Sequence, residues 1–307
     1  MSSITSSASQ IVATERPIAR RGVVGLYLEL TKARLSAMVL LTAAVGFVLG
    51  SGDHIDWTKM IWSVIGTALA AGCASALNQI IEIRRDRRMH RTQNRPLPSG
   101  AMSMQHSFIA AMLMGAAGLV VLAAGANLGA AWLALLTIVL YVVMYTPLKV
   151  RSSINTVVGA VCGAIPPMIG WVAASGSIDR GAWILGAILF VWQIPHFLAL
   201  AWLYREDYER GGFAMLPTID RKGQITCEVI VITSLLLLPI GLLATMLHVA
   251  GVVFAIGSLV LGAAMVAIGI RLYLNRTNAN ARYMFLASII YLPLLMCLLV
   301  FDRGPVG

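Results

Sequence analysis

Long apolar runs, separated by short polar segments, follow one another along almost the whole chain. Several of these runs reach the roughly 20 residues that a helix needs to span a bilayer. They do not alternate polar and apolar positions as the strands of a membrane β-barrel do, so the pattern predicts an all-α membrane protein, a bundle of nine transmembrane helices. The expected spans are residues 35–52, 58–81, 105–125, 129–148, 154–175, 182–204, 225–247, 251–272 and 283–301.

The distribution of charge predicts how this bundle is oriented. Of the 307 residues 59% are hydrophobic and 12% charged, which indicates that lipid surrounds the helices. The net charge of +10 could suggest a nucleic-acid ligand. With the N-terminus in the cytoplasm, however, every basic residue except Lys59, Arg180 and Arg303 falls in a cytoplasmic segment. The positive-inside rule therefore predicts an N-in, C-out orientation and no nucleic-acid partner.

The first residues lack a membrane-spanning signal. Residues 1–22 are rich in Ser and basic but have no apolar core of a secretory signal, so we expect a flexible cytoplasmic tail. Residues 23–34 are typical of an amphipathic segment at the membrane interface, and residues 23–303 should form a single polytopic domain. The shortness of the tail favours a bacterial cytoplasmic membrane, while a mitochondrial presequence, and thus the inner membrane, stays open.

The most informative polar residues lie directly after the second span. Asn78, Glu82 and Asp86 recur every four residues, which puts their oxygen atoms along one stripe of a helix. Six arginines lie between residues 84 and 95, and a proline-broken loop follows. Such oxygen ligands beside dense positive charge suit a divalent cation that holds a phosphorylated substrate, since Mg²⁺ binds through few carboxylates plus substrate phosphates. The alternative is an ordinary cytoplasmic loop with two incidental acids.

Two features in the middle of the chain add to this picture. The fourth span ends just before Lys149 and Arg151, which either anchor the membrane end or reach an anionic phosphate from the cytoplasmic face. In the fifth span Pro166 and Pro167 remove two backbone donors, so we expect the helix to break there. In lipid, such a break persists only where protein or a cavity covers it.

The sixth span carries polar side chains at positions where lipid would make them costly. Gln193 and His196 lie inside it, and an intramembrane polar residue marks an interior-facing functional surface, unless the histidine is merely packed and hydrogen-bonded. In one continuous helix, His196 and Asp207 would face within about 20° of each other, with Gln193 and Tyr204 on the same side. Pro195 should kink this helix toward a cavity.

Acidic residues gather at two cytoplasmic helix ends, where the positive-inside rule favours cations. Five of the 13 in the chain are found there: Glu82, Asp86, Glu206, Asp207 and Glu209. The two clusters end spans that are four helices apart, a pattern compatible with two four-helix units followed by one helix.

These motifs resemble a known family. The stripe from Asn78 to Asp86 is similar to the first acidic motif of the intramembrane aromatic prenyltransferase superfamily, that of the 4-hydroxybenzoate polyprenyltransferases. Residues 78–98, 145–149, 192–197 and 207–217 together resemble the protohaem IX farnesyltransferases, or haem O synthases, and the resemblance covers about residues 25–300. Glu82 stands where Asp is usual, and the second cluster lacks the DxxxD form of quinone-pathway relatives, which alters the expected ligand geometry more than the activity.

The resemblance implies transfer of the farnesyl group of farnesyl diphosphate to a vinyl group of haem b. Water addition would then give haem O, for haem A and cytochrome oxidase biogenesis, with haem A synthase as a further partner. The implied catalytic and Mg²⁺-binding residues are Asn78, Glu82, Asp86 and Asp207. The implied substrate-binding residues are Arg91, Arg95, Lys149 and Arg151 for the leaving diphosphate, and Gln193, His196 and Tyr204 in the cavity. His196 would ligate the haem iron or orient the porphyrin.

Two other functions stay open at this stage. The same prenyl transfer could serve another acceptor, a quinone precursor or chlorophyllide, which conversion of 4-hydroxybenzoate but not of haem b would establish. Alternatively, a transporter could use the carboxylates for cation or proton coupling. A transport site is expected near the middle of the membrane, whereas both acid clusters lie at cytoplasmic helix ends.

Overall fold

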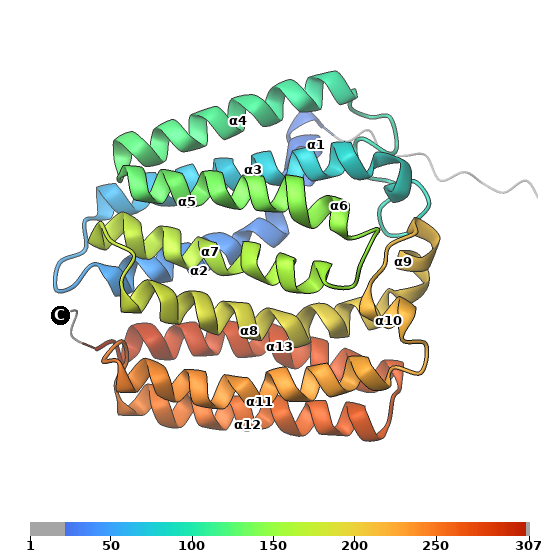
Figure 1. Cartoon of the computed structure of the whole chain (residues 1–307). Helices are drawn as coiled ribbons and strands as arrows, with labels where there is room; N and C mark the ends of the chain where they lie inside the picture. The colour runs from blue at the N-terminus through green and yellow to red at the C-terminus, as the bar shows by residue number, and fades with distance from the viewer. Residues whose placement is uncertain (1–21, 305–307) are drawn as a thin grey trace, which may run out of the picture.

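A computed structural model describes residues 22–304, so the predicted tail lies outside the described residues except for Gly22. Apart from one isolated bridge, the secondary structure of residues 22–304 is helical. Nine of the described helices are long and apolar enough to cross a membrane, which confirms the predicted number of spans. They are α2 (Ala33–Gly50), α3 (Trp57–Asp86), α4 (Met104–Gly125), the continuous α5–η1–α6 (Leu128–Val139, Leu140–Tyr145 and Thr146–Leu148), α7 (Asn155–Ser175), α8 (Arg180–Leu203), α11 (Gln224–Met246), α12 (Val252–Leu274) and α13 (Asn278–Phe301), as Figure 1 shows.

The centre of the bundle is formed by α7 and α8. In their most apolar windows 72% and 67% of the residues are buried, against 44% or fewer in every other described span. The outer helices expose large apolar side chains instead, among them Leu113, Trp132 and Ile290. Lipid is the solvent that suits such a surface, whereas most residues of the two central spans face protein.

Close backbone contact between α2 and α7 keeps α7 continuous. A Cβ atom added at Gly46 would overlap the carbonyl oxygen of Pro167, and one added at Gly170 would overlap that of Ala43. Small residues allow membrane helices to approach in this way. The predicted break at Pro166 and Pro167 is therefore wrong, because α7 runs unbroken from Asn155 to Ser175 and packing against α2 covers both buried prolines.

The helix that carries His196 ends at Leu203, close to the predicted end of the sixth span, and does not continue to Asp207. The N–H of Tyr204 closes α8 on the carbonyl of Leu200, while its own carbonyl accepts from the N–H of Tyr208 and opens α9 (Arg205–Gly211). Asp207 therefore belongs to a separate helix, and the predicted angle between it and His196 along one helix is wrong. Pro195, in contrast, lies inside α8 without interrupting it.

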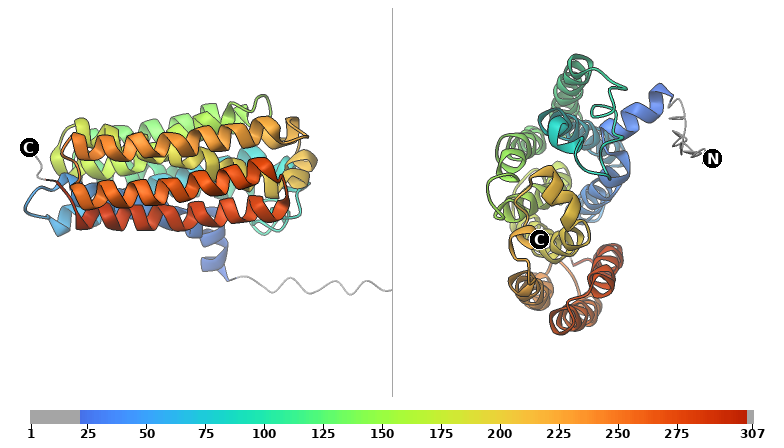
Figure 2. Two further views of the ribbon diagram at one scale, coloured as in Figure 1. Left: turned by 90° about the horizontal axis from the view of Figure 1, so that it is seen from below. Right: turned by 90° about the vertical axis from the view of Figure 1, so that its right-hand side faces the viewer.

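Both acid-bearing connections lie at the same end of the bundle, as predicted. In Figure 1 this end, on the right, also carries α10 (Leu216–Ile219), and α13 ends at the opposite end of the bundle. Nη1 of Arg85 donates to the carbonyls of Gly211 and Gly212, both at 3.1 Å, and thereby ties the two connections together. Figure 2 shows the short helix α1 (Val23–Leu30) standing away from the side of the bundle. The predicted duplication of a four-helix unit stays a prediction.

Candidate active site

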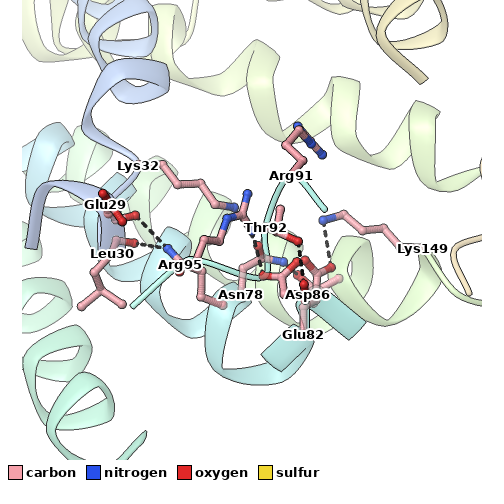
Figure 3. Close-up of polar contacts among 12 residues, drawn as sticks. Glu29, Leu30, Lys32, Asn78, Glu82, Asp86, Arg91, Thr92, Arg95 and Lys149 are labelled. Atoms are coloured by element: carbon pink, nitrogen blue, oxygen red, sulfur yellow. Dashed lines mark hydrogen bonds and ion pairs between the residues drawn. The ribbon is translucent and has the colours of Figure 1, made fainter. Parts of the chain in front are cut away.

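The last turns of α3 bury the predicted stripe of oxygen ligands. Asn78, Glu82 and Asp86 are 0%, 4% and 0% exposed, and their side chains lie along one side of the helix in Figure 3. If Glu82 and Asp86 were incidental acids of an ordinary cytoplasmic loop, their carboxylates would remain hydrated, because burying an ionised group is costly. The burial therefore favours a binding site over two incidental acids.

Each member of the stripe is paired with a cationic side chain from a different part of the chain (Figure 3). The pairs are Lys32 Nζ with Asn78 Oδ1 at 2.8 Å, Lys149 Nζ with Glu82 Oε1 at 2.9 Å and Arg95 Nη1 with Asp86 Oδ2 at 2.8 Å. A buried ion pair recovers little more than its own desolvation cost, so it adds little to stability. Two such pairs, side by side with the hydrogen bond from Lys32 to Asn78, indicate a binding site for an ionic ligand.

The oxygen atoms of this stripe fit a divalent metal ion. Asp86 Oδ1 is buried and has no hydrogen-bond partner among the described residues. An unsatisfied buried carboxylate oxygen is costly unless a cation completes it. Two carboxylates and one amide are also the kind of sparse oxygen set through which Mg²⁺ binds when a substrate phosphate supplies further ligands.

The pKa values of the two lysines of the site are shifted in opposite directions. Burial acts to lower the pKa of Lys149, but the attraction of the Glu82 carboxylate, with Tyr141, outweighs it and raises the pKa above its ordinary value. Burial, followed by repulsion from Arg95 and Lys149, lowers the pKa of Lys32 to about 7, although Glu82 and Asp86 act in the opposite direction. Lys149 is thus a permanent cation of the site.

Lys32 was not among the predicted site residues. It has a left-handed backbone, φ 51°, between α1 and α2, a conformation uncommon in residues other than glycine. Nε2 of Gln79 holds the preceding turn by donating to the carbonyls of Glu29 and Leu30. The sequence places Lys32 just before the first span, at the end of the bundle that also carries the stripe. Only the tertiary structure shows that its side chain reaches Asn78.

Asp207 binds the arginine-rich loop that follows α3, at His90 and Arg91, and not the stripe. Its two carboxylate oxygens accept from the backbone N–H groups of His90 (3.1 Å) and Arg91 (3.2 Å), and Arg210 forms an ion pair with it. No three His, Cys, Asp or Glu side chains in residues 22–304 are grouped so that they could hold one metal ion. The structure therefore does not bring Asp207 into one ligand group with Glu82 and Asp86.

The charge of Asp207 suits this anchoring contact. Burial acts to raise its pKa, but the hydrogen bonds from Arg210, His90 and Arg91 outweigh it and hold the pKa below its usual value. Since a carboxyl group with a lowered folded-state pKa loses its stabilising effect only as the pH falls through that pKa, the contact persists at neutral pH.

The other predicted phosphate-binding residues occupy different positions. The guanidinium of Arg91 lies 4.8 Å from the ring centroid of Tyr204 and 5.5 Å from that of Tyr208, and its Nη2 donates to the Tyr208 hydroxyl at 3.2 Å. The predicted Tyr204 is therefore a platform for this arginine. Arg151 is exposed and forms no hydrogen bond or ion pair with the stripe in the described part of the chain.

Gln193 and His196 lie deeper in the bundle, on α8. Gln193 is buried against Gly163 of α7, and its Nε2 donates to the carbonyl of Leu189 at 3.0 Å. His196 faces α13 instead, where its Nδ1 lies 2.8 Å from Ser288 Oγ. No hydrogen bond or ion pair among residues 22–304 joins either side chain to the stripe, so the site has two separate polar zones.

Comparison with known proteins identifies the family. Residues 39–289 match the model of the UbiA prenyltransferase family. The chain belongs to the UbiA prenyltransferase family. A protein of Solibacter usitatus, named protoheme IX farnesyltransferase, is 39% identical over 286 residues, which cover 90% of this chain and 98% of the relative. The mitochondrial protoheme IX farnesyltransferase of Arabidopsis thaliana is 43% identical over 90% of this chain and 64% of its own length.

Solved structures of UbiA relatives share the fold. A digeranylgeranylglyceryl phosphate synthase superposes with a TM-score of 0.76 at 16% identity, over 91% of this chain and 98% of its own. A UbiA homolog of Archaeoglobus fulgidus, bound to DMAPP and Mg²⁺, has a TM-score of 0.63 at 14% identity, over 89% and 98% of the two chains. The chain is thus an integral, multi-pass membrane prenyltransferase.

Proposed function

We propose that this prenyltransferase transfers the farnesyl group of farnesyl diphosphate to a vinyl group of haem b, giving haem O. The observation that carries the proposal is the buried, cation-paired stripe in a chain 39% identical to a protoheme IX farnesyltransferase over 98% of that relative. A haem A synthase, which would consume the product, is the proposed partner in the same membrane.

The stripe and its cations would manage the departing diphosphate. Bound Mg²⁺, held by Asn78, Glu82 and Asp86, would supply charge neutralisation on the diphosphate. Lys32, Arg95 and Lys149 lie where they can exchange their present partners for diphosphate oxygens. With the charge neutralised, the allylic C–O bond breaks and its electron pair stays on the diphosphate.

The apolar interior of the bundle would receive the farnesyl chain and limit the access of water to the allylic cation. The π electrons of the haem vinyl group form the new C–C bond and leave a cation next to the porphyrin ring. The oxygen of one water molecule then adds to that carbon and releases a proton, which leaves a hydroxyethylfarnesyl substituent.

The acceptor is tested with purified protein. Incubation with Mg²⁺, labelled farnesyl diphosphate and haem b should yield a labelled haem whose mass has increased by one farnesyl group and one hydroxyl group. Parallel reactions receive 4-hydroxybenzoate or chlorophyllide in place of haem b. If either alternative acceptor were converted and haem b left unchanged, the proposed acceptor would be wrong, while the assignment as a prenyltransferase would stand.

The proposal includes an orientation with both acid-bearing connections in the cytoplasm, in a bacterial membrane. The distribution of the 23 basic residues supports it, since all but three fall on that side. A reporter fused after Gly307 should read as periplasmic, or as intermembrane space in a mitochondrial setting. A cytoplasmic signal from this fusion would contradict the orientation.

Lys32 should contribute to diphosphate binding. Replacing Lys32 by Met removes one hydrogen-bond donor from the stripe, so affinity for a non-hydrolysable farnesyl diphosphate analogue should fall roughly tenfold, about 1.4 kcal/mol. Lys222→Met serves as the control, since Lys222 is exposed at the same end of the bundle. Equal affinities of the two variants, measured by calorimetry in detergent, would exclude Lys32 from the site.

A further inference from the structure

Thr146 follows a widened turn of the fourth span. The segment η1, Leu140–Tyr145, is a π-helix, and the N–H of Thr146 donates to the carbonyl of Tyr141, five residues earlier. The next residue, Pro147, has no N–H to donate, and its ring disfavours a regular α-helical turn before it. Such π-helical turns are frequent at functional sites. At this turn Oγ1 of Thr146 lies 3.0 Å from Nδ2 of Asn78 in α3.

The hydroxyl proton of Thr146 is used within its own helix. Oγ1 donates to the carbonyl of Tyr141 at 2.7 Å, and a threonine hydroxyl has a single proton. Toward Asn78, Oγ1 can therefore only accept. The end of the Asn78 amide that faces Oγ1 must be the NH₂ group, because the amide oxygen would find no proton there. Thr146 thus determines which end of the amide points toward the fourth span.

The oxygen end of the amide is left for the site. Oδ1 of Asn78 accepts from Nζ of Lys32 at 2.8 Å, and Asn78 lies on the same side of α3 as Glu82 and Asp86 (Figure 3). Mg²⁺ takes oxygen ligands. A reversed amide would present its NH₂ group to the cation instead, so the orientation of this side chain decides whether Asn78 can contribute to metal binding.

Solvent does not replace the hydroxyl of Thr146. Asn78 and Thr146 are 0% and 2% exposed. Without the hydroxyl, an N–H of Asn78 would be buried without its acceptor, which favours any rotation of the amide that finds another partner. Groups that hold a metal ligand in place in this way typically change metal affinity 10- to 100-fold when they are removed.

We propose that Thr146 is a positioning residue for Asn78: its hydroxyl oxygen binds the amide NH₂ group and thereby directs Oδ1 toward the metal and diphosphate zone of the stripe. Thr146 acts through Asn78 alone. The inference rests on the proposed function, since it takes Mg²⁺ and a diphosphate as the ligands of the stripe. The expected consequence of losing the hydroxyl is therefore a higher Mg²⁺ requirement.

The test measures binding of a non-hydrolysable farnesyl diphosphate analogue at a series of Mg²⁺ concentrations, by calorimetry on the full-length protein in detergent. Thr146→Val removes the hydroxyl at nearly constant shape, Thr146→Ala is a second variant without it, and Thr146→Ser keeps it. Thr67→Val is the matched control, because Thr67 is also 2% exposed and its hydroxyl donates to the carbonyl of Ser63 in its own helix at 2.7 Å. Asn78→Ala, alone and combined with Thr146→Val, completes the set.

The Mg²⁺ concentration for half-maximal analogue binding should rise about tenfold in Thr146→Val and Thr146→Ala, and stay within about twofold of the wild-type value in Thr146→Ser and Thr67→Val. Adding Thr146→Val to Asn78→Ala should cause no further rise, because the threonine acts through that amide. Thermal unfolding is measured alongside. A merely structural threonine would lower the unfolding temperature and leave the Mg²⁺ requirement unchanged.

Three results would overturn the inference: a wild-type Mg²⁺ requirement in Thr146→Val, the same rise in Thr146→Ser as in Thr146→Val, or a further rise in the double variant. Conversion of haem b by the wild type is followed in parallel. If haem O forms while one of these results holds, the positioning role is wrong and the proposed function stands. If the Mg²⁺ requirement shifts as expected but haem b is not converted, the role of Thr146 stands and the acceptor is wrong. Binding of the analogue by the wild type without any need for Mg²⁺ would overturn the metal site and this inference together.

Discussion

Replacing Asp86 by Asn should reduce farnesyl transfer at least about a hundredfold while the protein still inserts and folds, a loss of about 2.7 kcal/mol in transition-state stabilisation. The substitution preserves size but removes a charge that is fully buried in the stripe. It also leaves Arg95 without its ion-pair partner and replaces one of the two carboxylate oxygens by an NH₂ group, although Oδ1 of Asp86 is the one buried carboxylate oxygen without a hydrogen-bond partner among the described residues. Metal binding and diphosphate neutralisation would both suffer.

The measurement is the rate of haem b conversion at saturating Mg²⁺ and farnesyl diphosphate, together with thermal unfolding in detergent. Glu209→Gln is the matched control, because this carboxylate is exposed at the same end of the bundle. Glu82→Asp, which introduces the residue more usual in the superfamily, should keep partial activity. Full activity of Asp86→Asn at saturating Mg²⁺ would remove this carboxylate from the mechanism.

The nine spans and the stripe were predictable because each rests on a constraint that acts along the chain itself. The thickness of the bilayer sets the length of a spanning helix, so apolar runs alone locate the nine spans to within a few residues. The helical period likewise places Asn78, Glu82 and Asp86 on one stripe, whatever surrounds them. Neither prediction needs knowledge of a neighbouring helix.

The features that the sequence did not predict depend on contacts between distant segments. Continuity of α7 through Pro166 and Pro167 relies on the close approach of Gly46 from α2. The position of Lys32 depends on its left-handed backbone and on Asn78, 46 residues away. Local propensity and spacing carry no information on such contacts, because a tertiary partner overrides them.

Asp207→Asn should weaken binding of the farnesyl diphosphate analogue by roughly 10- to 100-fold, about 1.4 to 2.7 kcal/mol, and leave haem binding unchanged. In the structure this carboxylate accepts from the N–H groups of His90 and Arg91 and pairs with Arg210. An asparagine has one acceptor oxygen, so its amide NH₂ would face one of the two backbone donors. The loop that carries Arg91, and that brings Arg95 to Asp86, would then lose its anchor.

Two comparisons separate an anchor for the loop from a ligand for the metal. Arg210 is partly exposed and supplies one of the three contacts, so Arg210→Met should lower the affinity for the analogue less than Asp207→Asn does, and Glu206→Gln, an exposed neighbour, should leave it unchanged. The Mg²⁺ concentration for half-maximal activity should stay at the wild-type value in Asp207→Asn and rise in Glu82→Gln. If Asp207→Asn instead raised the Mg²⁺ requirement as Glu82→Gln does, Asp207 would be a metal ligand, and the loop would have to move to let it reach the stripe.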